Sequence, residues 1–210
     1  MNYVQTLVKA LARLTIRVSW NIWGSIQTPY ATYRTLISQD LWQLLLILAL
    51  AAIYFFGVSP IKLHSLHPLL LTLNASRLFV TAIISFLLIC SFLRLLGNLF
   101  GVSSQLRAIA LAWGYSLIPT LIWFSVTTLF YVILPPPRHA TIAGIAFSLL
   151  YLTFSLSLFF WKGLLYYLTL RFALRLDLLR IIGISLIFLP TLALYSLLLY
   201  YFGIFKVPFV

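Results

Sequence analysis

Negative charge is almost absent from this sequence, and charge of any kind is scarce. Only 2 of the 210 residues are Asp or Glu, and 8% are charged, whereas an average soluble domain has roughly 25% charged residues. A surface that faces water needs more charge than this, so an ordinary soluble globular protein is excluded. The single cysteine, Cys90, excludes an internal disulfide and a metal site built from cysteines alone.

Hydrophobic residues make up most of the chain. They account for 63% of it, aromatic residues for 17%, and the mean hydropathy is +1.11. This composition excludes disorder and indicates that most of the surface faces lipid. A helix needs about 20 apolar residues to cross roughly 30 Å of hydrocarbon, where the backbone must bond to itself. We therefore expect an all-α polytopic membrane protein with five transmembrane helices, at about residues 41–58, 78–93, 108–134, 141–161 and 181–205.

Positive charges fall unevenly on the two sides of these spans. Of the 14 Lys and Arg residues, ten precede the first span or follow the second and fourth. These ten are Lys9, Arg13, Arg17, Arg34, Arg94, Arg107, Lys162, Arg171, Arg175 and Arg180. Because cytoplasmic segments are enriched in Lys and Arg, the sequence predicts a cytoplasmic N-terminus and an external C-terminus.

Residues 1–40, ahead of the membrane domain at 41–210, are predicted to form two amphipathic surface helices. The first has a cationic and an apolar face, as expected of a helix in the membrane interface. The faces consist of Lys9, Arg13 and Arg17, and of Leu7, Leu11, Leu14 and Val18. The cations contact anionic lipid in one hypothesis, only set the topology in a second, and belong to a targeting presequence in a third. We expect Gly24-Ser25 to end this helix and Thr28 to cap a second one at residues 29–37.

Two further features concern helix ends. Ser38 is expected to cap the first span, with Asp40 in its first turn. The segment RFALRLDLLR, residues 171–180, is predicted to form another basic surface helix, in which Asp177 is placed to pair with Arg180. Its arginines and Arg34 complete the predicted lipid-contacting residues. In full these are Lys9, Arg13, Arg17, Arg34, Arg171, Arg175 and Arg180.

Glycine and proline interrupt the central part of the chain. The loop between residues 94 and 107 is apolar and contains Gly97 and Gly101, so we expect tight turns that hold it at the membrane surface. Pro119 and Pro190 lie within the third and fifth predicted spans. Each removes a backbone hydrogen bond, which predicts a bent helix.

The stretch LLGNLFGVSSQLRAIALAWGYSLIPTL, residues 95–121, resembles the hallmark of Yip1-domain membrane proteins. In that family a glycine-containing loop, here with Gly97 and Gly101, leads into a span with Gly-Tyr and Ile-Pro pairs. Here these pairs are Gly114-Tyr115 and Ile118-Pro119. The resemblance covers roughly residues 25–205, including Pro29 before a short amphipathic segment. It implies five spans with a cytoplasmic N-terminus.

The same resemblance carries expectations about function. Eukaryotic members of the family are linked to Rab GTPases and to vesicle traffic between endoplasmic reticulum and Golgi. The long cytoplasmic N-terminal region of those members is missing here, so GTPase binding is doubtful and a bacterial-type member in the inner (plasma) membrane is expected.

No Asp, Glu, Lys, Arg or His lies deep in any predicted span. This argues against an enzyme, a proton-coupled pump and a charge-lined channel. No cofactor is expected, nor a metal, since His64 and His67 have no companion ligands nearby. Nucleic acid is not expected either, because the positive charge is spread along the membrane surface. The hydroxyl groups of the fourth span are expected to bond to backbone or between helices. They belong to Ser148, Thr153, Ser155 and Ser157.

Two functional hypotheses follow. The first is a non-catalytic, membrane-organising or trafficking-like scaffold whose basic cytoplasmic face binds anionic phospholipid or a membrane-protein partner, including a second copy of the chain. The second is a component of a transporter or channel. A polar cavity among the third to fifth spans would favour transport, and a dry interior filled with Leu and Phe would favour the scaffold.

Overall fold

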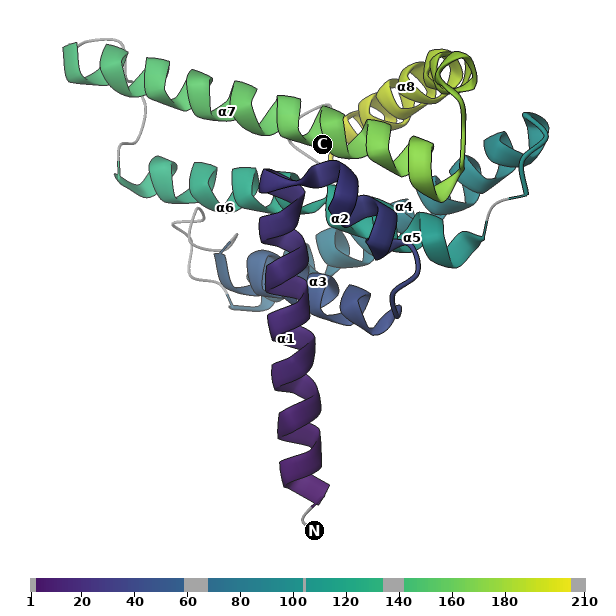
Figure 1. The fold of residues 1–210 in the computed structure, drawn as a ribbon. Coiled ribbons are helices and arrows are strands. Elements are labelled where there is room, and N and C mark those ends of the chain that lie inside the picture. Colours follow the sequence, from purple (N-terminus) through teal and green to yellow (C-terminus); the bar gives the residue numbers. More distant parts are fainter. Residues whose placement is uncertain (1–2, 59–67, 104, 134–141, 205–210) are drawn as a thin grey trace.

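A bundle of helices forms the body of the protein, and the first helix projects from it (Figure 1). This computed structural model describes residues 3–58, 68–103, 105–133 and 142–204, which form helices and turns without a strand. The predicted all-α class is confirmed. The elements are α1 (Tyr3–Gln27), α2 (Pro29–Leu36), α3 (Trp42–Ile53), the π-helical η1 (Tyr54–Val58), α4 (Pro68–Leu99), α5 (Leu106–Ser116), α6 (Ile118–Ile133), α7 (Ile142–Leu168), the π-helical η3 (Thr169–Ala173) and α8 (Leu178–Tyr201).

Four helical stretches among the described residues are long and apolar enough to cross a membrane. They are Leu73–Leu99, Leu106–Phe130, Ile142–Ala173 and Leu178–Tyr201. The first predicted span forms α3 and η1, together Trp42–Val58, which is shorter than these four. At about 1.5 Å per residue it rises roughly 25 Å, less than the roughly 30 Å of hydrocarbon. Four stretches thus have the dimensions of membrane spans, and a fifth crossing depends on this short helix.

The helices that contain the second and fourth predicted spans extend beyond the predicted limits. α4 runs through Arg77 and Arg94, and α7 continues past Trp161 and Lys162. Lysine and arginine are good helix formers with long apolar stems, so a single one of them does not end a helix. Gly97, predicted to lie in a loop, is a helical residue of α4.

The N-terminal helix α1 continues through Gly24 and Ser25, so the break predicted there is wrong. Gly24 instead allows α2 to approach closely, since a Cβ atom at Gly24 would lie 2.4 Å from Thr32 Oγ1. Pro29 begins α2 as predicted, but the side chain of Thr28 makes no capping hydrogen bond. In Figure 1, α1 runs across the direction of α6 and α7.

The start of α3 also differs from the prediction. Leu41 is its N-cap residue, so Asp40 precedes the helix instead of lying in its first turn. Ser38 does not cap α3, because its hydroxyl donates to the Thr35 carbonyl at 2.8 Å.

The core of the protein surrounds α5. Half of the most apolar 18-residue segment within Leu106–Phe130 is buried, whereas only 6% of the corresponding segment within Ile142–Ala173 is buried. Protein therefore encloses α5, and α7 presents its side chains outward. Gly114 allows α3 to pack against α5, because a Cβ atom there would lie 2.4 Å from Leu44 Cδ2. The buried residues of α5 are Ala108, Ile109, Leu111, Ala112, Trp113, Gly114, Tyr115 and Ser116.

The two prolines act differently on their helices. Near Pro119 the third span is interrupted, with α5 ending at Ser116 and α6 beginning at Ile118. Pro119 is then in the first turn of α6, where a missing N–H group has no intrahelical partner to lose. Pro190 lies inside α8, which continues through it. Between α4 and α5, Gly101 has φ 77°, as expected of a glycine in a tight turn.

The predicted surface helix at residues 171–180 is wrong. η3 ends at Ala173, α8 begins at Leu178, and Arg175 between them has φ 52°. Leu174 and Leu176 are both completely buried. Burial of these two leucines outweighs the amphipathic helix pattern, because it removes apolar side chains from the surface at a turn of the chain.

We predict that Gly114→Val destabilises the protein, because the added side chain overlaps Leu44 at the α3–α5 contact. Overpacking of this kind costs about 1–3 kcal/mol, so the midpoint of thermal unfolding in detergent falls by several degrees. Gly163→Val is the matched control, because nothing lies within 4 Å of a Cβ atom at that position. Equal midpoints for both variants would contradict close packing at Gly114.

Candidate functional site

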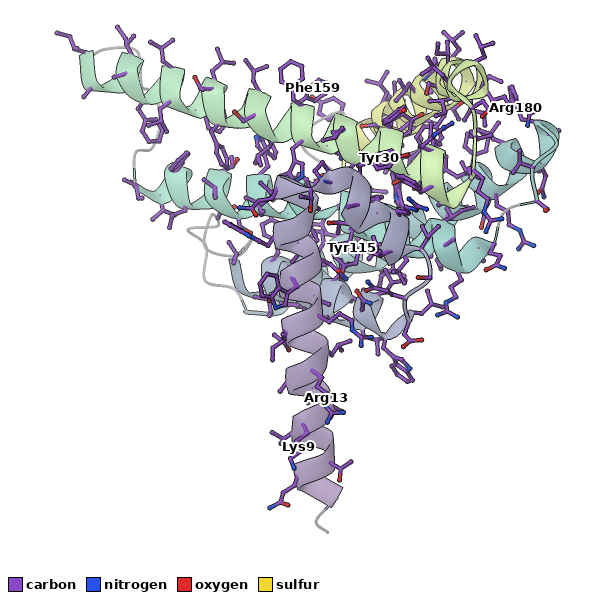
Figure 2. All side chains as sticks on the ribbon, in the orientation of Figure 1. Lys9, Arg13, Tyr30, Tyr115, Phe159 and Arg180 are labelled. Carbon is purple, nitrogen blue, oxygen red and sulfur yellow. The ribbon has the colours of Figure 1, made fainter. Side chains whose placement is uncertain are left out.

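The predicted lipid-contacting residues lie in two separate regions. Lys9 and Arg13 are exposed on the projecting part of α1, whereas Arg180 lies on the opposite side of the body (Figure 2). Arg34 is exposed on α2. The structure therefore does not bring the seven cations together into one patch.

An ion-pair cluster lies where α1 meets the body. Arg107 Nη2 is 3.3 Å from Asp40 Oδ1 and donates to the Gln39 carbonyl at 2.8 Å. Arg17 Nη1 is 4.0 Å from the other carboxylate oxygen of Asp40. Asp40 is 67% exposed, and exposed pairs of this kind contribute only about 0–1 kcal/mol. The cluster therefore orients α1 without holding it strongly.

A buried polar cluster beneath this surface holds α1 more firmly. Asn21 Nδ2 donates to Gln39 Oε1 at 2.8 Å, to Gln43 Oε1 at 2.9 Å and to Tyr115 Oη at 3.2 Å. The Tyr115 hydroxyl donates to Gln43 Oε1, and Gln43 Nε2 donates to Gln39 Oε1. Four side chains from α1, the α2–α3 connection, α3 and α5 thus bond to one another, with Asn21, Gln43 and Tyr115 buried and Gln39 half-buried. This cluster was not predicted from the sequence. Gln43, a polar residue in an apolar run, is the signal that could have indicated it.

The helix α2 is anchored by aromatic side chains. The buried Tyr33 hydroxyl donates to the Ala112 carbonyl at 3.2 Å, and burial raises the pKa of the Tyr33 phenol above its ordinary value. Tyr30 packs edge-on against Phe172 of η3, with ring centroids 4.7 Å apart. Near the turn between α1 and α2, Trp161 Nε1 of α7 donates to the Ser25 carbonyl at 3.2 Å. These contacts place α2 between α5 and the end of α7.

The motif residues singled out in the sequence serve packing roles. Gly101 forms the α4–α5 turn, Gly114 is a contact point for α3, and Tyr115 belongs to the buried polar cluster. Pro119 and Pro190 lie 71 positions apart on α6 and α8.

The arginines of residues 171–180 differ in their surroundings. Arg171 Nη1 donates to the Leu176 carbonyl at 2.8 Å and lies 3.5 Å from Asp177 Oδ1. The predicted pairing of Asp177 with Arg180 is therefore replaced by pairing with Arg171, because the chain turns at Arg175. Arg175 and Arg180 are exposed.

An apolar cavity of about 300 Å³ lies among α3, α4, α5, α6 and α8. Leucine, isoleucine and phenylalanine side chains make up most of its wall. Lys162 of α7 also lines the cavity, and no carboxylate is among the lining residues. The sequence predicts that Lys162 follows the fourth span, at residues 141–161, but α7 continues through it to Leu168.

The hydroxyl groups of α7 behave as predicted. Ser148, Thr153 and Ser157 each donate to the carbonyl four residues earlier, all at 2.9 Å. Ser155 accepts a hydrogen bond from Trp123 Nε1 on α6 at 3.0 Å. His64, His67 and His139 lie outside the described residues.

No protein-family model, curated protein or solved structure matches this chain.

We predict that Asn21→Ala loosens α1 from the body. Removing the donor leaves Gln39, Gln43 and Tyr115 without one shared partner, at a cost of about 1–3 kcal/mol. Limited proteolysis in detergent checks this, with faster cleavage within α1 expected. The control is Thr15→Ala, whose exposed hydroxyl donates only to the Leu11 carbonyl of the same helix. Cleavage of α1 at the same rate in both variants would show that the cluster does not hold it.

Proposed function

We propose that this chain is a non-catalytic integral membrane protein that organises the membrane by binding anionic lipid through basic residues on its cytoplasmic side. The outward-facing apolar side chains of α7 support its place in the bilayer. Phe159 and Phe160 are 70% and 71% exposed, and Leu179 at the start of α8 is 82% exposed. Apolar surface on this scale is stable in lipid and costly in water.

The projecting part of α1 is the observation that carries the proposal. Val8, Leu11 and Ile16 are each more than half exposed, beside the exposed cations Lys9 and Arg13. A helix that offers apolar and cationic residues together is suited to the headgroup region, where both find partners. Because α1 runs across the direction of α6 and α7, it would lie along the membrane surface when those helices cross the bilayer (Figure 1).

The cavity supports the scaffold over a transporter or channel. Its wall is mainly apolar, and the hydroxyl groups at Ser148, Thr153 and Ser157 bond to their own helix. A water-filled path for a polar solute needs polar groups along its length.

The topology and the family remain part of the proposal. We infer a bacterial inner membrane, a cytoplasmic N-terminus, an external C-terminus and kinship with Yip1-domain proteins. The distribution of Lys and Arg and the motif at residues 95–121 support these inferences. A membrane-protein partner or a second copy of the chain is the alternative occupant of the basic surface.

We predict that α1 contacts anionic lipid through Lys9, Arg13 and Arg17. Cys90 is the only cysteine and is buried, so a Cys90→Ala background allows a label at Leu11→Cys. In bilayers with phosphatidylglycerol this label is expected to be several-fold less accessible to a water-soluble quencher than in pure phosphatidylcholine. Each cation near an anionic surface contributes about 1 kcal/mol. Changing the three cations to Gln is expected to abolish the difference.

The control for this experiment removes three cations elsewhere. Arg94, Arg175 and Arg180 are exposed outside α1, and their change to Gln is expected to leave the label protected. Equal accessibility in both bilayers before any change would overturn lipid binding by α1. Protection that requires a second copy of the chain, and no anionic lipid, would favour self-association.

We also predict that the two ends of the chain lie on opposite sides of the membrane. Trp42–Val58 decides this, because four crossings place both ends together and five separate them. Reporter fusions at the two termini are expected to give opposite responses. Reporters in one compartment would show that Trp42–Val58 does not cross.

A further inference from the structure

Lys162 is a half-buried cation that lines the apolar cavity. No ion pair or hydrogen bond reaches its ammonium group within the part of the chain that the structure describes. Two residues that line the cavity, Trp113 and Thr120, each have a buried polar atom, Nε1 and Oγ1 respectively, without a hydrogen-bond partner among the described residues. All three groups can donate a hydrogen bond, and the lysine and the tryptophan can only donate.

This donor set selects the chemistry of a ligand. Leaving a buried donor unpaired destabilises the protein, and more so when the donor is charged. An anionic oxygen, as in a carboxylate or phosphate, accepts from an ammonium group and an indole N–H and neutralises the charge. The surrounding Leu, Ile and Phe side chains suit the hydrocarbon part of the same molecule.

The shape of the cavity fits such an amphiphile. Its lining residues on α3 and η1 extend from Leu44 to Phe55, which corresponds to about 16 Å along a helix. One leaflet of a bilayer has about the same depth, roughly half of 30 Å. Tyr166, one turn after Lys162, contacts Trp113 with ring centroids 6.5 Å apart. Lys162 therefore lies toward the Leu44 and Trp113 end of the cavity, at the opposite end from Phe55.

The neighbouring tryptophan relates this end to the membrane surface. Trp161 bonds to Ser25 at the end of α1, and α1 is the helix proposed to lie in the headgroup region. Lys162 is thereby placed near headgroup depth, with the apolar part of the cavity extending away from it.

We propose that this cavity binds an anionic lipid, with its carboxylate or phosphate on Lys162 and one acyl chain along the wall toward Phe55. The membrane depth in this inference rests on the proposed function, but the site is separate from the α1 surface. The ligand is held by one charge and one chain, so a free fatty acid and an anionic phospholipid share the required chemistry.

Titration of the purified full chain in non-ionic detergent, followed by native mass spectrometry, tests the site. The probes are palmitate and phosphatidylglycerol, with hexadecanol and phosphatidylcholine as their uncharged or zwitterionic counterparts. One molecule of an anionic probe is expected to bind per chain, at least about tenfold more tightly than its counterpart. Tighter binding of palmitate would identify a fatty acid as the ligand, and tighter binding of phosphatidylglycerol a phospholipid.

Variants distinguish the contribution of the Lys162 charge to binding from that of the space in the cavity. Lys162→Gln is expected to remove the preference for the anionic probes, Lys162→Arg to retain it, and Ala82→Phe, which fills the cavity, to weaken binding of all probes. Arg94→Gln removes an exposed cation outside the cavity and is expected to change nothing. If Lys162→Gln does not fold, Lys162→Arg and Ala82→Phe still test the site.

Two results would overturn the site: equal binding of charged and uncharged probes by the original chain, or undiminished binding by Ala82→Phe. The change of Lys9, Arg13 and Arg17 to Gln is expected to leave palmitate and phosphatidylglycerol binding in the cavity intact. Loss of protection at α1 with intact cavity binding would therefore defeat the proposed function and leave this inference standing.

Discussion

The buried hydrogen bonds among Asn21, Gln39, Gln43 and Tyr115 are the interaction on which the arrangement of the N-terminal helix depends. The amide groups of Asn21 and Gln43 and the phenol of Tyr115 are buried, so their pairing avoids the cost of unsatisfied polar groups. Asn21 is the common donor, and it can reach its three partners only when α1 crosses near the start of α3 and the end of α5. The exposed ion pairs of Asp40 then add orientation at the surface.

Beside the apolar cavity, in contrast to the cluster around Asn21, buried donors have no acceptor among the described residues. At the base of α1 the donors of Asn21, Gln43 and Tyr115 have acceptors, whereas Trp113 Nε1 and Thr120 Oγ1 beside the cavity have none among the described residues. Lys162 lines the same cavity. A protein interior usually satisfies its polar groups, so an arrangement of this kind indicates a molecule that supplies the missing acceptor. The cluster around Asn21 therefore holds α1 against the body of the protein. The cavity at Lys162 has the chemistry of a ligand site.

Several local predictions failed where packing outweighed a pattern. Gly24 and Gly97 lie within helices because close neighbours or helix continuity matter more there than the freedom of glycine. Gly101, with φ 77°, is the position where that freedom is used. The segment at residues 171–180 has an amphipathic helical pattern, but Leu174 and Leu176 are buried by a turn instead. Pro119 lies in the first turn of α6, just after the break between α5 and α6, whereas α8 continues through Pro190.

The sequence by itself indicated lipid surroundings and determined the helical class. With 63% hydrophobic residues and 8% charged ones in long continuous apolar runs, helices satisfy the backbone within each segment. It also located the segments of four long helices and the basic character of α1. Only the tertiary structure decided which polar residues meet, because Asn21 and Tyr115 are 94 positions apart. It likewise decided that Lys162 lines a cavity, since five other helices form the walls around it and periodicity along one helix cannot reveal what the neighbouring helices bring.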